Sequence, residues 1–163
     1  MQFDFEETIW IARPPLEVFE FMTTPSNWPH YAPGMVAAKT LGEGPVGPGT
    51  QMLISIGMLG TTVDIKVEFE EFEPGKVFSS RNIEDPKIMT VNRTTLVEEK
   101  GGTRITRAST IEPRAVFVHL TAPLVRAAVR RNAKREFENV KAMLEQGPDA
   151  LGPRRDPAAV APD

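Results

Sequence analysis

Arg107 is the polar residue whose position most directly suggests chemistry. It shares the even-spaced face of a predicted strand with Ile105, Ser109 and Ile111, and alternate residues of a strand point to the same side. A charge on a buried face needs an opposite charge or a ligand anion, because unpaired burial is costly. The sequence therefore offers Arg107 as an anchor for a carboxylate, enolate or phosphate. Two alternatives stay open: it pairs with a nearby carboxylate, or it reaches solvent at the strand end.

Two histidines and one tyrosine are the further candidates for proton transfer. His30 and Tyr31 are neighbours just after Trp28, and His119 lies far along the chain. A metal site usually needs three or four His, Cys or carboxylate ligands, and the chain has no cysteine, which also excludes disulfides and thiol nucleophiles. We therefore predict no metal and no cofactor, and keep His30 and Tyr31 as possible proton carriers beside Arg107.

Three glycines match the spacing of the dinucleotide-binding fingerprint, at Gly42, Gly44 and Gly47. That fingerprint requires a helix after the glycines, whose amides hold the pyrophosphate. Here Pro45 and Pro48 remove amides and a strand pattern follows. The segment is predicted to be a connector between strands, without a nucleotide.

A basic segment stands out in a chain whose formal net charge is −3. Residues 113–145 hold seven Lys or Arg against three Asp or Glu, while the rest is acidic, which argues against nucleic-acid binding. At helical spacing Arg126, Arg130 and Lys134 form one row, expected opposite the apolar stripe. We interpret it as a solvated face, with peripheral contact to an anionic membrane as the alternative. The whole run is Arg126, Arg130, Arg131, Lys134 and Arg135.

The elements that must position these residues follow from periodicity and turn signals. Even spacing of apolar residues predicts several strands, joined by turns rich in Gly and Pro. Pro14 and Pro15 predict a short helix, and a helical turn follows near Trp28. The strands are expected at residues 3–11, 36–41, 52–56, 63–69, 77–83, 88–98 and 103–112.

A long helix is predicted over residues 114–145, with a kink or restart at Pro123. The fold class is therefore α+β: an antiparallel sheet of six or seven strands wrapped around a C-terminal helix, with two short helices after the first strand. Residues 1–146 are expected to form one domain. Residues 147–163, rich in Pro and Ala, are expected to be a flexible tail.

A twisted sheet wrapped around one helix leaves a wedge, and such apolar hollows bind small ligands. For each apolar residue of the proposed lining, plain core is the alternative, and Trp28 is as well suited to plug the closed end. Arg81, Thr90 and Asn92 are weaker polar candidates than Arg107. The predicted ligand-binding residues are Trp28, Tyr31, Met52, Ile54, Ile56, Val67, Phe69, Arg81, Asn92, Arg107, Phe117, Leu120 and Leu124.

Five segments in this order resemble the START-like SRPBCC superfamily, whose members are often described as polyketide cyclases or dehydrases. They are residues 11–21, 25–29, 42–50, 101–106 and 136–145. The resemblance implies a helix-grip fold with an apolar pocket. It implies no shared catalytic motif, because the superfamily contains lipid carriers, cyclases and hormone receptors alike.

Three functions follow as hypotheses. The first is a carrier or sensor that binds a small hydrophobic molecule of lipid, polyketide or aromatic type. The second is an aromatase/cyclase-type enzyme that uses Arg107 to stabilise an enolate. The third is a regulatory module that acts through the basic helix. The sequence shows no signal peptide and no membrane span, so we expect a cytoplasmic protein, monomeric or homodimeric.

Overall fold

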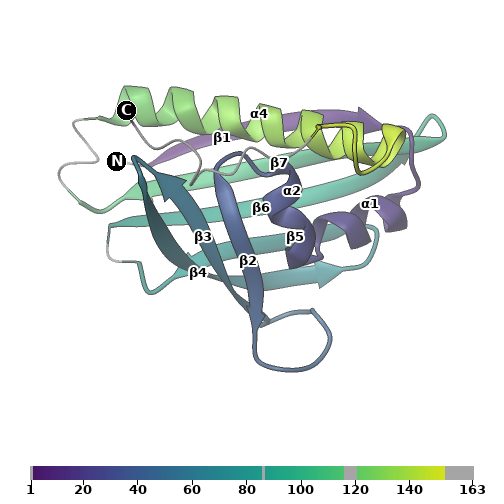
Figure 1. Ribbon diagram of the computed structural model, residues 1–163. Coiled ribbons are helices and arrows are strands. Elements are labelled where there is room, and N and C mark those ends of the chain that lie inside the picture. The colour runs from purple at the N-terminus through teal and green to yellow at the C-terminus, as the bar shows by residue number, and fades with distance from the viewer. Residues whose placement is uncertain (1, 86, 116–120, 153–163) are drawn as a thin grey trace.

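The computed structural model describes residues 2–85, 87–115 and 121–152, and Figure 1 shows their arrangement. Within them the strands form one antiparallel sheet in the order β1-β7-β6-β5-β4-β3-β2. The predicted α+β class is confirmed. The seven strands of the described residues are β1 (Phe3–Ile11), β2 (Met35–Leu41), β3 (Gln51–Met58), β4 (Thr61–Glu73), β5 (Val77–Ile83), β6 (Ile88–Glu99) and β7 (Gly102–Pro113).

The helices follow the proline signals closely. The helix α1 (Pro15–Met22) begins with a proline in its first turn, where the missing N–H has no helical partner to lose. The 3-10 turn η1 (Pro25–Asn27) and the short helix α2 (Trp28–Tyr31) come next. All three lie at one end of the sheet, before β2 begins.

The long helix α4 (Ala122–Gln146) starts later than residue 114, where the sequence pattern placed it. The strand β7 runs on to Pro113, and the amides of Arg114 and Ala115 donate to the Lys87 carbonyl instead of opening a helix. Pro123 lies in the first turn of α4, so it starts the helix and does not kink it. The expectation for residues 116–120 lies outside the described residues.

The side chain of Trp10, a residue of β1, packs against the hairpin between β6 and β7. Lys100 and Gly101 both have positive φ, at 50° and 75°, as the tightest hairpin turns require. The Trp10 indole N–H donates to the Glu99 carbonyl over 2.8 Å. The indole therefore lies over the first residue of β7, Gly102, where only a hydrogen can fit.

Gly102→Ala is expected to lower the free energy of unfolding by about 1–3 kcal/mol, the usual cost of overpacking. A Cβ at this position would overlap the Ile11 carbonyl oxygen and would lie 2.7 Å from the Trp10 ring. Gly47→Ala is the matched control, because nothing lies within 4 Å of its Cβ. Urea denaturation measures both, and equal stabilities would contradict the close approach at Gly102.

Buried apolar side chains of the described residues form two clusters. The larger lies where α1 and α2 meet the sheet and contains edge-to-face aromatic pairs. Phe19 packs against Phe72 at 5.0 Å between ring centroids, and Phe69 packs against Phe72 at 5.3 Å and Phe78 at 6.3 Å. This end of the fold is filled by side chains.

The second cluster seats the first half of α4 on the edge strand β1. Phe3 and Phe5 are buried there with Ala133, and Val125 and Val129 pack against them. Figure 1 shows α4 running lengthwise along this edge of the sheet, beside β1 and β7. The strands β2 to β5 lie away from the helix.

Polar contacts hold the second half of α4. Asn139 donates to the Tyr31 carbonyl over 2.8 Å, and the Lys141 ammonium donates to the Trp10 carbonyl over 2.7 Å. The Glu145 carboxylate accepts from the Ala12 amide over 2.9 Å. Burial acts to raise the pKa of Glu145, but the hydrogen bonds from Ala12 and Lys141 outweigh it and leave that pKa below its ordinary value.

Candidate functional site

The inner face of the sheet, on which α4, α1 and α2 pack, carries polar side chains in its middle. Arg107 lies there because it alternates with buried Ile105 on β7. The strand register places Thr94 of β6 directly opposite Arg107. One row further along, Ser109 pairs with Asn92, and Asn92 pairs with Ser80 of β5. These residues form a band across β7, β6 and β5.

Arg107 forms an ion pair with Glu136 of α4. Its Nη1 lies 2.8 Å from the Glu136 Oε1, and the two side chains are only 12% and 19% exposed. Its Nε donates to the Thr94 hydroxyl over 3.3 Å, and the guanidinium lies 4.9 Å from the centre of the Phe137 ring. The sequence left three alternatives for Arg107: a ligand anion, a carboxylate partner or solvent. The structure shows the carboxylate partner.

Glu136 is therefore a site residue that reasoning from the sequence missed. A signal was available: Glu136 follows Ala133 by three residues and precedes Val140 by four, so it lies on the buried side of α4. Its partner is 29 positions away in the sequence. Only the register between α4 and β7 identifies the pair.

Tyr31 and His30 face different surroundings although they are neighbours. The Tyr31 side chain is buried and its hydroxyl donates to the Met22 carbonyl over 3.3 Å. Burial raises the pKa of Tyr31 well above its ordinary value, and the Glu136 carboxylate adds to this while Arg107 opposes it. The phenol keeps its proton, so it is not a base. His30 is exposed on α2, and His119 lies outside the described residues.

On β5 and β6, three half-buried inner-face side chains have polar atoms without a hydrogen-bond partner among the described residues. They are the hydroxyls of Ser80 and Thr90 and the amide nitrogen of Asn92, all on half-buried residues. The Asn92 oxygen is occupied, because it accepts from the Ser109 hydroxyl over 2.6 Å. These atoms are available to a ligand.

The side chain of Asn82, beside this group on β5, forms hydrogen bonds with the backbone. Its side-chain nitrogen donates to the Ile88 carbonyl over 2.7 Å, and its oxygen accepts from the Thr90 amide over 2.6 Å. It closes the end of the β5–β6 pair with one hydrogen bond from its nitrogen and one to its oxygen. The unpartnered polar atoms are therefore confined to Ser80, Thr90 and Asn92 on this part of the face.

Exposure of the inner-face side chains rises along β3, β4 and β6 with distance from α1. On β3, Met52 and Ile54 are buried, Ile56 is half-buried and Met58 is exposed. On β4, Phe69 and Val67 are buried, Ile65 is half-buried and Val63 is exposed. On β6, Leu96 and Thr94 are buried, and Asn92 and Thr90 are half-buried. On β7, by contrast, Ile105, Ser109 and Ile111 are all buried. The inner face is thus open over β3 to β6 and covered beside α4.

Several proposed lining residues belong to the aromatic end instead of the open end. Trp28 packs edge-on against Phe69 at 5.8 Å, and its indole N–H donates to the Met22 carbonyl over 2.8 Å. Phe69 and Met52 are completely buried. For these residues the structure shows core packing, as the alternative interpretation expected.

Two further candidates lie away from the inner face. Because Ser80 pairs with Asn92, its neighbour Arg81 points to the outer face, where it forms an ion pair with Glu70 at 2.9 Å. Leu124, in the first turn of α4, is 75% exposed. Phe117 and Leu120 lie outside the described residues.

The first two members of the basic row on α4 do not lie opposite the apolar stripe, which corrects our expectation. The Arg126 guanidinium lies 4.8 Å from the centre of the Phe3 ring, and that of Arg130 lies 6.0 Å from the Phe5 ring. Both arginines thus border the contact between α4 and β1. Arg126 is half-buried, whereas the exposed members of the basic run are Arg130, Arg131, Lys134 and Arg135.

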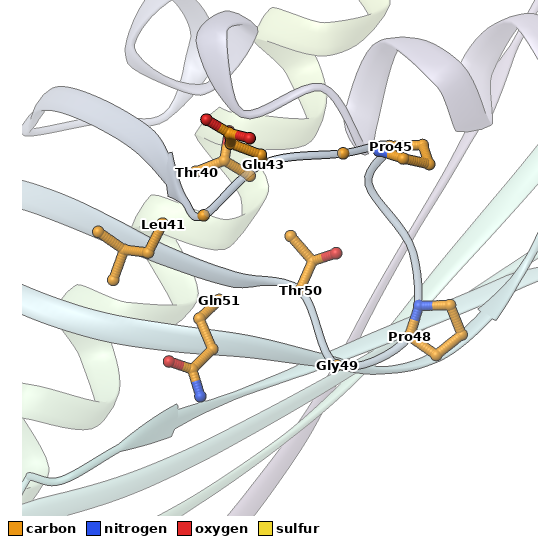
Figure 2. A pocket seen from close by; sticks show the side chains of 10 residues that line it. Thr40, Leu41, Glu43, Pro45, Pro48, Gly49, Thr50 and Gln51 are labelled. Atoms are coloured by element: carbon orange, nitrogen blue, oxygen red, sulfur yellow. The ribbon is translucent and has the colours of Figure 1, made fainter.

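The glycine-rich segment forms a strand connector, as predicted. Figure 2 shows it as an open loop between β2 and β3, with Leu41 and Gln51 at its two ends. The loop borders a hollow of about 320 Å³ lined by residues 40–45 and 48–51. A second hollow, of about 300 Å³, is lined by Leu16, Phe19, Glu20, Thr23, Thr24, Pro25, Val46, Phe72 and Pro74. Neither includes Arg107, Asn92 or a residue of α4.

The described residues were also compared with the requirements of a metal site and of a membrane span. In the described ranges no group of three histidine or carboxylate side chains comes close enough to hold a metal ion. Nor does any helix among the described residues combine the length and the apolar character needed to cross a membrane.

The chain is similar to known proteins in sequence and in structure. A family model described as "Polyketide cyclase / dehydrase and lipid transport" matches residues 2–145. The Zhui aromatase/cyclase from Streptomyces sp. R1128 is similar in structure, with a TM-score of 0.76 and 16% identity over 90% of this chain and 95% of that one. A START superfamily protein from Mycobacterium smegmatis gives a TM-score of 0.73 and 11% identity over 88% and 97%. None of the curated proteins matches the sequence.

Proposed function

The chain belongs to the polyketide cyclase/dehydrase and lipid transport family of the START-like superfamily, and from this premise we propose that it binds a small hydrophobic molecule as a carrier or sensor. The molecule lies on the inner face of the sheet, over β3 to β6. The observation that carries the proposal is the rise in exposure along β3, β4 and β6. Interiors of folded proteins are close-packed, so half-buried side chains on an inner face mark space that a ligand fills.

The chemistry of the space supports a mainly apolar ligand. Ile54, Ile56, Ile65 and Val67 form its β3–β4 side and are buried or half-buried. The aromatic cluster fills the end nearest α1, so the ligand lies beyond the band that contains Arg107. Covering the remaining apolar surface contributes about 25 cal/mol per Å² to binding.

The state of the polar residues supports binding in preference to the cyclase hypothesis. An arginine that stabilises an enolate needs uncompensated charge directed at the reacting oxygen. The charge of Arg107 is balanced by Glu136 at 2.8 Å, and the Tyr31 hydroxyl already donates to Met22. In this arrangement Arg107 is not free to stabilise an enolate, and the Tyr31 hydroxyl is not free to transfer a proton.

A thermal-shift screen of fatty acids, isoprenoids and polyaromatic compounds tests the proposal, together with native mass spectrometry of the purified protein. A ligand at about 100 times its Kd stabilises the fold by about 2.7 kcal/mol, which raises the Tm of a domain of this size by roughly 5–10 °C. A flat response across all three classes, with no co-purified molecule, would refute ligand binding.

A pair of variants locates the bound molecule. Ile65→Trp fills the half-buried part of the inner face, so it is expected to abolish the shift. Lys66→Trp places the same side chain on the outer face and is expected to leave the shift unchanged. If the two variants behave alike, the ligand does not lie over β4.

A further inference from the structure

We propose that the end of the molecule at which α4 begins docks on the surface of an anionic lipid bilayer. The docking surface consists of the basic run of α4 and the apolar side chains at the turn between β3 and β4. This inference goes beyond the proposed function, because it concerns the outside of the molecule and holds for any ligand of the inner face. Two observations carry it: positive charge without ion pairs, and an exposed leucine in a turn that favours asparagine.

The first half of α4 carries only positive charge. Residues 122–135 hold five Lys or Arg and no Asp or Glu. None of the five forms an ion pair with a carboxylate among the described residues, and the Nε of Arg126 is buried without a hydrogen-bond partner. Like charges four residues apart, as at Arg131 and Arg135, destabilise a helix. Folding therefore does not explain this run, whereas an anionic surface would offset the repulsion.

The carboxylates near the basic run do not neutralise it. On β1, Asp4 and Glu6 lie on the outer face, and Glu7 lies opposite Arg107. On α4, Glu138 follows Lys134 by four residues but forms no ion pair with it among the described residues. The carboxylates at the nearby strand ends accept hydrogen bonds or ion pairs from the sheet and its turns; they are Asp64, Glu84, Asp85 and Glu112.

The turn between β3 and β4 presents an apolar side chain that the fold does not need. Leu59 and Gly60 form a two-residue turn in which both have positive φ, at 49° and 79°. Such a turn favours asparagine at its first position and disfavours leucine. The Leu59 side chain is 100% exposed, so no packing within the chain offsets this strain. A leucine here points to a contact outside the chain.

This turn and the basic run lie at the same end of the molecule. Neighbouring strands are antiparallel from β1 to β3, so the start of β1 and the β3–β4 turn share one end of the sheet. The helix α4 begins at that end, because Arg126 lies over Phe3 of β1. Figure 1 shows both toward the left. The exposed apolar side chains at this end are Met58, Leu59, Val63 and Leu124.

An anionic bilayer matches both features of this end at once. Its headgroups attract Lys and Arg, and the boundary between headgroups and acyl chains takes up exposed aliphatic side chains. A soluble polyanion would engage the charges but leave Leu59 in water. The combination of basic and aliphatic side chains on one end therefore favours a lipid surface over an acidic protein.

Sedimentation with vesicles tests the proposal. The wild-type protein is expected to bind vesicles of equal parts phosphatidylcholine and phosphatidylglycerol about 100-fold more tightly than vesicles of phosphatidylcholine alone. This affinity is expected to fall about tenfold or more between about 50 and 300 mM NaCl. Equal binding to the two kinds of vesicle, or no binding to either, would overturn the inference. The proposed function would then still stand on its thermal-shift screen.

A triple charge reversal tests the basic run. Arg131→Glu/Lys134→Glu/Arg135→Glu is expected to bind anionic vesicles no better than phosphatidylcholine vesicles. The matched control is Lys39→Glu/Lys76→Glu/Lys100→Glu, which changes the net charge equally at exposed residues away from this end. It is expected to lose affinity by about threefold or less. Thermal unfolding confirms that both variants are folded, and equal losses in the two would overturn the assignment of the surface.

Leu59→Asn tests the apolar part of the surface. Asparagine suits the turn, so the Tm is expected to stay or rise, while the affinity for anionic vesicles falls about tenfold. Val97→Thr, at an exposed apolar position on the outer face of β6, is the control and is expected to leave the affinity unchanged. If soluble poly-glutamate binds as tightly as the vesicles and Leu59→Asn has no effect, the partner is an acidic protein and the lipid assignment is overturned.

Discussion

Phe69→Ala is expected to lower the free energy of unfolding by about 3–5 kcal/mol, because it empties the centre of the aromatic cluster. Phe69 is 1% exposed and packs against Trp28, Phe72 and Phe78, with ring centroids 5.8, 5.3 and 6.3 Å away. Alanine would leave a cavity that these rings cannot fill, since each is also held by other neighbours. Urea denaturation monitored by circular dichroism measures the loss.

A second substitution on β4 compares the stability lost at a buried core position with that lost at the half-buried open end. Ile65→Ala removes a half-buried side chain at the open end, four positions before Phe69 on the same face of β4. It is expected to cost about 1–2 kcal/mol, since less apolar surface is lost from the interior. Equal losses at the two positions would mean that the aromatic end is no better packed than the open end.

Arg107→Met is expected to cost about 3 kcal/mol, because Glu136 would remain largely buried without its partner. The double variant Arg107→Met/Glu136→Leu replaces both charges with apolar groups and is expected to return to within about 1 kcal/mol of the wild type. Methionine keeps an apolar contact to the Phe137 ring, on which the guanidinium now lies. Together with the Glu136→Leu single variant, the four free energies of unfolding form a double-mutant cycle that isolates the energy of the pair.

The ion pair between Arg81 and Glu70 is the matched control for this cycle. It also joins an arginine to a glutamate at 2.9 Å, but both side chains are more than 40% exposed. Exposed pairs contribute about 1 kcal/mol or less. If the coupling energy of Arg107 and Glu136 is no larger than that of Arg81 and Glu70, the inner-face pair is not a buried one in solution.

Much of the fold could be predicted because its signals are local. Alternation on β4 and the turn at Lys100 and Gly101 depend on neighbouring residues, and the order of the strands follows from short connections. The predicted start of α4 was wrong because apolar residues after Pro113 continue a helical pattern, while the backbone there bonds to Lys87 on the β5–β6 connection. No local pattern contains that contact.

The candidate site was predicted unevenly for a similar reason. Arg107 was assigned to the inner face because Ile105 and Ile111 fix the parity of β7. The strand β5 lacks such a signal, since Ser79 and Phe78 are both buried although they face opposite sides. The Ser79 hydroxyl accepts from the Glu71 amide on the outer face. The sequence therefore points to Arg81 as inward, whereas the structure places Ser80 there, whose small side chain has no distinctive pattern.

The contacts that hold α4 differ at its two ends, which has a consequence for how the helix moves. Directional bonds from Asn139, Lys141 and Glu145 immobilise the segment near Gln146, while the segment near Ala122 is held by apolar contacts that tolerate sliding. A rod fixed at one end undergoes its widest thermal displacement at the other. The motion of α4 is therefore expected to be wider near Ala122 than near Gln146, where the aromatic cluster lies.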